Sequence, residues 1–79
     1  MNTELARRAV ACKHWNEIDK ERQEWVAVTL LACVEMADKI IAEAERHKLP
    51  ARVEQLGHDR EALVAALEHL GYCVREGKL

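Results

Sequence analysis

The sequence predicts an all-α protein, built as an antiparallel helical hairpin or a three-helix bundle that pairs into a homodimer. More than half of its 79 residues are Ala, Glu, Lys, Leu or Arg, all strong helix formers. It holds one proline and three glycines, and the glycines all lie in its last third. Its apolar residues recur at alternating steps of three and four, which is the spacing of one face of a helix. A chain this short is expected to form a single helical domain over residues 1–79.

A first helix is expected over about residues 3–47, because neither glycine nor proline interrupts the chain before Pro50. Proline disfavours the helical conformation of the residue before it, so Leu49 marks the end of this helix. Asn16 is a competent N-cap, and a break near 16–19 is therefore the alternative to one continuous helix. Residues 25–34 also suit a buried strand, but the three-four spacing continues beyond them and favours a helix.

A second helix is expected over about residues 51–70. Pro50 suits the first helical position, and Gly71 suits the position just after the C-cap. Gly57 costs the helix about 1 kcal/mol relative to alanine. Since Asp59 could cap a fresh start, a break at Gly57 is left open. The remaining residues, 71–79, are expected to form a short tail.

The two predicted helices differ in how many apolar stripes they carry. The second helix has one stripe, whereas the first helix has two. One of these two, which we call the first stripe, consists of Trp15, Ile18, Arg22, Trp25, Thr29, Ala32 and Met36. A helix with two apolar stripes needs two neighbours, which predicts a homodimer. The residues expected to line the core or the dimer interface are Val26, Leu30, Cys33, Ile40, Leu56, Leu63, Leu67 and Leu70.

Charge and cysteine content limit the possible partners and the compartment. Twelve basic and fourteen acidic residues are spread evenly, so no segment is basic enough for the phosphate contacts of a nucleic-acid-binding protein. Three scattered cysteines are typical of a reduced, intracellular chain. The most apolar run, residues 25–34, is half the length of a membrane span, and no export signal is visible. We therefore expect a cytoplasmic protein with no membrane partner and with nucleic acid disfavoured.

No catalytic, metal or cofactor site is expected. Serine is absent, and no histidine lies three residues after a glutamate, as a carboxylate-bridged di-iron bundle would need. Glu43 with His47, and Glu54 with His58, share a helical face but are expected to be surface pairs. Residues 53–70 have the rhythm of a helix-turn-helix motif, but the helix that would enter the DNA groove is acidic. DNA phosphates would repel it.

Binding to another protein is the function that the composition favours. Trp15, Arg22 and Trp25 lie on the first stripe among alternating charges, and tryptophan and arginine are the residues that anchor protein interfaces. In a dry core Arg22 would need a carboxylate partner, so an open surface suits it better. The alternative is that both tryptophans are ordinary core or homodimer residues.

The first fifteen residues, MNTELARRAVACKHW, resemble the start of small open reading frames in temperate phages and prophages. The resemblance implies a phage accessory protein made in the cytoplasm of a bacterial host. Small helical proteins of this kind often bind and block a host protein, as anti-defence inhibitors do. The expected function is therefore a non-enzymatic inhibitor or modulator of a host protein. A small DNA-associated regulator and a phage assembly or structural accessory protein are the alternatives.

Overall fold

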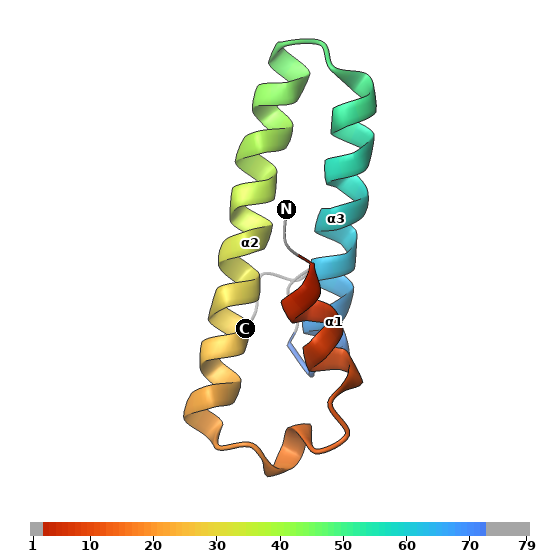
Figure 1. The fold of residues 1–79 in the computed structure, drawn as a ribbon. Coiled ribbons are helices and arrows are strands. Elements are labelled where there is room, and N and C mark those ends of the chain that lie inside the picture. Colours follow the sequence, from red (N-terminus) through yellow and green to blue (C-terminus); the bar gives the residue numbers. More distant parts are fainter. Residues whose placement is uncertain (1–2, 73–79) are drawn as a thin grey trace.

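The computed structural model describes residues 3–72 and is all-α over this range, with no strand. Its elements are α1 (Glu4–Ala11), a short 3₁₀ helix (Trp15–Glu17), α2 (Lys20–Arg46) and α3 (Pro50–His69). The helices α2 and α3 lie side by side in opposite directions, and α1 packs beside the C-terminal half of α3 (Figure 1). The predicted tail from residue 73 onward lies outside the described residues.

The turn between α2 and α3 is a helix end in which one residue adopts the left-handed conformation. Lys48 has φ 55°, and its N–H donates to the carbonyl of Glu45 at 3.1 Å. The N–H of Leu49 donates to the carbonyl of Ala44 at 3.0 Å, which completes the pair of bonds of a Schellman motif. Pro50 then opens α3 at a position where its missing N–H costs nothing. The chain therefore reverses within three residues.

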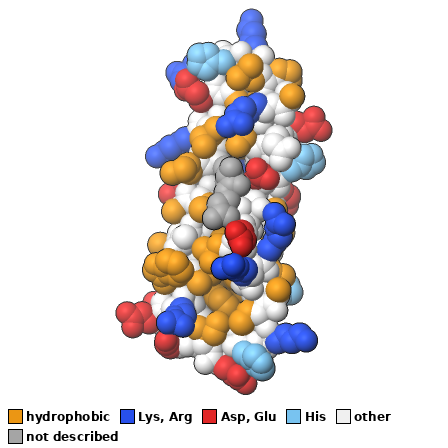
Figure 2. Space-filling view, viewed as in Figure 1, with side chains coloured by type: hydrophobic (Ala, Val, Ile, Leu, Met, Phe, Trp, Pro, Cys, Tyr) orange, Lys and Arg blue, Asp and Glu red, His pale blue; other side chains and the backbone are white. Residues whose placement is uncertain are grey.

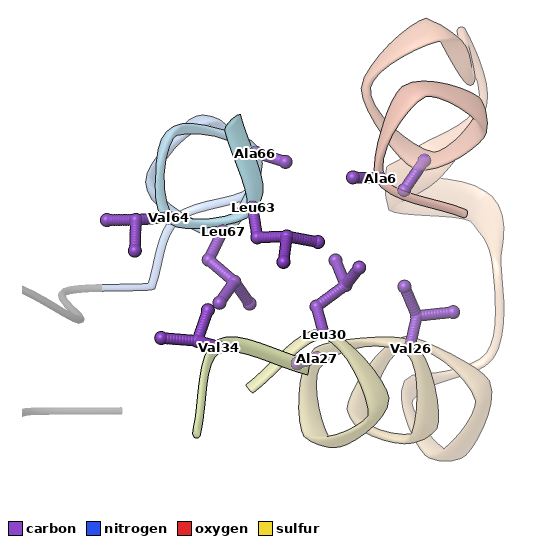
Figure 3. Packing of buried hydrophobic residues seen from close by; sticks show 10 residues of the cluster. Ala6, Val26, Ala27, Leu30, Val34, Leu63, Val64, Ala66 and Leu67 are labelled. Carbon is purple, nitrogen blue, oxygen red and sulfur yellow. The ribbon is translucent and has the colours of Figure 1, made fainter. Parts of the chain in front are cut away.

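The core lies between α2 and α3. Leu30 of α2 and both Leu63 and Leu67 of α3 are 0% exposed, and their side chains converge between the two helices (Figure 3). Burying each of these side chains contributes roughly 1.5–3 kcal/mol. The other residues expected in the core are buried or half-buried in the single chain: Val26 and Leu56 are buried, and Cys33, Ile40 and Leu70 are half-buried.

The chain breaks between α1 and α2 and folds back, so the first helix is not continuous. The break spans residues 12–19, which is earlier and longer than the break near 16–19 that the sequence allowed. Ala6 and Ala9 are the buried residues of α1, and Ala6 faces Ala66 of α3 (Figure 3). Small side chains at this contact let the helices approach closely. The side-chain amide of Gln23 donates to the backbone carbonyl of Trp15 at 2.6 Å, which holds the 3₁₀ helix against α2.

The helix α3 runs through Gly57 without a break. It ends in a second Schellman motif, in which the N–H of Tyr72 donates to the carbonyl of Leu67 and the N–H of Gly71 to that of Glu68, both at 3.0 Å. Gly71 has φ 100°, a conformation that residues with a Cβ adopt at a cost. The two glycines therefore have opposite roles, since only Gly71 needs its conformational freedom.

Replacing each glycine by alanine tests these opposite roles. A Cβ on Gly57 meets no atom within 4 Å, so Gly57→Ala is expected to raise the free energy of unfolding by about 0.5–1 kcal/mol. Gly71→Ala places a Cβ in the left-handed region and is expected to lower it by about 1 kcal/mol. Urea denaturation followed by circular dichroism measures both. A loss of stability in Gly57→Ala would contradict a continuous α3.

Candidate functional site: the outer face of α2

Large apolar side chains reach solvent on the face of α2 that points away from the core. Trp25, Val28 and Met36 are 61%, 63% and 61% exposed, and Ala32 lies among them. We call these four residues the outer face of α2. They follow one another at steps of three or four residues, so they form one stripe. In Figure 2 hydrophobic side chains reach the surface along the side of the molecule formed by α2.

The outer face of α2 has no counterpart on α3. Among residues 3–72 the large hydrophobic residues that are exposed are Val10, Trp25, Val28, Met36 and Leu49, and none of them belongs to α3. Apart from Pro50, the side chains that α3 exposes are polar, charged or alanine, including Arg52, Gln55 and His58. Single exposed apolar residues need no explanation, but a contiguous apolar stripe marks an interaction site. The surplus apolar surface of this chain is concentrated on one helix.

Charged side chains border the outer face of α2 at both ends. Glu21, Arg22 and Glu24 lie toward the N-terminus of the helix, and Lys39 and Glu43 toward its C-terminus. Within the described part of the chain Glu43 forms ion pairs with Arg46 and His47, whereas the other four form none. An apolar centre with a polar rim is the general anatomy of a protein–protein interface.

The structure separates the three residues that the sequence grouped as partner-binding. Arg22 and Trp25 are both exposed and line a shallow hollow of about 410 Å³ with Asp19 and Glu21 at the start of α2. Trp15 is half-buried and packs against the core cluster. The chain folds back at the break and places Trp15 against the core cluster, whereas Arg22 and Trp25 lie at the surface. The partner-binding role of Trp15 stays a prediction.

Three of the four residues of the outer face were already on the first stripe, and one was not. Ala32 and Met36 belong to the stripe that holds Trp25, but Val28 lies beside it. Val28 could have been found from its position three residues after Trp25 and four before Ala32. The run of apolar residues around it concealed which of them face the core.

A second hollow, of about 650 Å³, lies between α1 and α3. Alanines dominate its lining, with Arg7, Asp59 and His69 among the polar side chains that border it. The surface pairs expected from the sequence are present elsewhere: His47 Nε2 lies 3.0 Å from Glu43 Oε1, and His58 Nε2 lies 3.9 Å from Glu54 Oε1. All four of these side chains are exposed.

The described residues 3–72 hold neither a cluster of metal ligands nor a membrane-spanning helix. No group of three or more His, Cys, Asp and Glu side chains is placed to hold a metal ion there. None of the helices described combines the length and the apolar character that a membrane crossing requires. We compared the chain with known protein families, with curated proteins and with solved structures, and none of the three comparisons found a match.

Truncating the outer face of α2 tests whether it belongs to the fold. Trp25→Ala and Met36→Ala are each expected to change the free energy of unfolding by less than about 1 kcal/mol, because both side chains are mostly in solvent. Leu63→Ala is the matched core variant and is expected to cost about 3 kcal/mol. Urea denaturation of dilute protein measures all three. A cost for Trp25→Ala equal to that for Leu63→Ala would make this face part of the core.

Proposed function

We propose that the protein is a non-enzymatic protein-interaction module that binds another protein through the outer face of α2. The observation that carries this proposal is that Trp25, Val28 and Met36 are exposed on a single stripe. Completing the burial of three such side chains would contribute on the order of 3–5 kcal/mol to binding. A partner helix or a shallow apolar groove is the shape that complements a stripe of this kind.

Trp25 is the anchor of the proposed interface, and Arg22 is its polar neighbour. Both line the hollow at the start of α2, three residues apart on the same side of the helix. Interface energy concentrates in tryptophan, tyrosine and arginine side chains that become desolvated at the centre of the contact. Arg22 has no ion pair among the described residues, so its guanidinium is available to a carboxylate of the partner.

The partner we propose is a host bacterial protein that the module inhibits or modulates in the bacterial cytoplasm. Support for a phage origin is the resemblance of residues 1–15 to the start of phage and prophage reading frames. In the structure the described residues of that segment, 3–15, include α1, where Ala6 and Ala9 are buried in the core. The segment with the resemblance thus supports the fold, and the residues proposed to bind the partner lie outside it.

Capture from a bacterial host lysate with the tagged protein tests this function. Trp25→Ala and Arg22→Ala are each expected to reduce recovery of a specific partner at least about tenfold, as loss of interface anchors does. Gln55→Ala, an exposed change on α3, is the matched control and should capture as the unmodified chain does. Mass spectrometry identifies and quantifies the captured protein.

Three results would contradict the proposal. Equal capture by Trp25→Ala and Gln55→Ala would show that the outer face of α2 is not the binding surface. Strong binding to duplex DNA that falls steeply with salt would instead support the DNA-associated regulator. Co-purification with phage particles would support the structural accessory protein.

A further inference from the structure

We propose that the outer face of α2 also binds a second copy of this chain, with the two α2 helices antiparallel and crossing at Ala32. The inference rests on the proposed function only in using the same face as a docking surface. It adds an occupant, an orientation and a register. The arguments for it are the symmetry of the residues along α2, the order of the charges, and the area of the face.

Val28 and Met36 of the outer face are placed symmetrically about Ala32, and Trp25 has a lysine at its mirror position. Val28 and Met36 lie four residues before and after it, and Trp25 and Lys39 lie seven residues before and after it. A twofold axis at Ala32 therefore places Val28 against Met36 of the second copy, and Trp25 against its Lys39. The alanine at the crossing point permits the close approach of about 8–10 Å that packed helices adopt. An ammonium group over an indole ring is itself favourable.

One pair of charges on the borders of the face, Glu24 with Lys39 of the second copy, is complementary in this register. Glu24 and Lys39 are eight and seven residues from Ala32 on opposite sides, so Lys39 of the second copy lies close to Glu24. Glu43, eleven residues after Ala32, faces Glu21 of the second copy, eleven residues before it, and Arg22 lies next to that glutamate. In a parallel pair, each charged side chain would instead lie against the identical side chain of the second copy, and the two would repel. Opposite charges fix orientation and register, and like charges oppose the alternative.

The area of the outer face indicates weak, reversible pairing. Three side chains that are each about 60% exposed offer roughly 300–400 Å² per chain, against the roughly 800 Å² per partner of a standard interface. The helix α3 has no exposed large hydrophobic residue, so it offers no comparable face. Since self-pairing and host-protein binding both use Trp25, they are mutually exclusive, and the pair reduces the amount of chain free to bind its target.

Sedimentation velocity of the full chain at concentrations from about 5 to about 500 μM tests the pairing. This range covers the weak dissociation constants expected of an interface smaller than the standard size. We expect conversion from a 9.0 kDa monomer to a dimer as concentration rises. Lys39→Glu sets a carboxylate against Glu24 and should weaken the dimer about tenfold. Glu24→Lys should do the same, and the double variant should return to within about threefold of the unmodified chain. Circular dichroism checks that each variant remains helical.

The possible results distinguish the pairing, its register and the host-protein proposal. A chain that stays monomeric throughout, or a dimer that the single variants leave unchanged, would overturn the pairing. A double variant no better than the single ones would overturn the antiparallel register about Ala32. The host-protein proposal can fail separately, because Lys39→Glu retains Trp25 and Arg22. If Lys39→Glu loses the dimer but still captures the host protein fully, the result agrees with both proposals. Trp25→Ala is expected to lose capture, because Trp25 is the anchor of the proposed host-binding surface.

Discussion

The packing of Leu30 between Leu63 and Leu67 is the contact on which the other features of this protein depend. These three side chains are fully buried, and they set which side of α2 faces α3. Residues one half-turn away on α2 must then point outward, whatever their polarity. Trp25, Val28 and Met36 are exposed for this reason. The interior of the hairpin therefore determines the surface that we propose to be functional.

The short first helix shows how a chain of this length covers its core. The helix α2 has 27 residues and is about 40 Å long, whereas α3 has 20 residues and is about 30 Å long, so the N-terminal part of α2 needs another neighbour. Folding back at residues 12–19 supplies α1, whose buried residues are alanines. This small helix contacts both α3 and α2 and leaves the outer face of α2 open. An ion pair from Arg60 Nε to Asp38 Oδ1, at 2.5 Å, also links α2 to α3.

Much of the fold could be predicted because its determinants are local. Pro50 and Gly71 mark helix ends by their own backbone chemistry, and the regular leucines of α3 identify its buried side. The break after Ala11 could not be located, since no glycine or proline causes it and the contact of Ala6 with a distant helix favours it. For the same reason the sequence left open whether Trp15 lies at the surface or in the core. Gly57 carries a local penalty that the packing of α3 on α2 outweighs.

The candidate site could be predicted in part. Arg22 and Trp25 follow from their type and spacing, because an arginine on an apolar stripe is hard to bury. Val28 has the spacing of this stripe, but residues 25–34 are apolar on several sides, and the position of α3 decides which of them are covered. The exposed stripe is thus a consequence of tertiary packing, although each of its residues is visible in the sequence.

Fluorescence quenching of Trp25 by acrylamide, in a Trp15→Phe variant that leaves one tryptophan, tests the central claim most directly. If the outer face of α2 is open surface that another polypeptide covers, the quencher should reach Trp25 freely in dilute solution. Quenching should then fall as protein concentration rises and copies pair. A tryptophan shielded in dilute solution would place this face inside the fold. One that is equally accessible at every concentration would show that no second copy covers it.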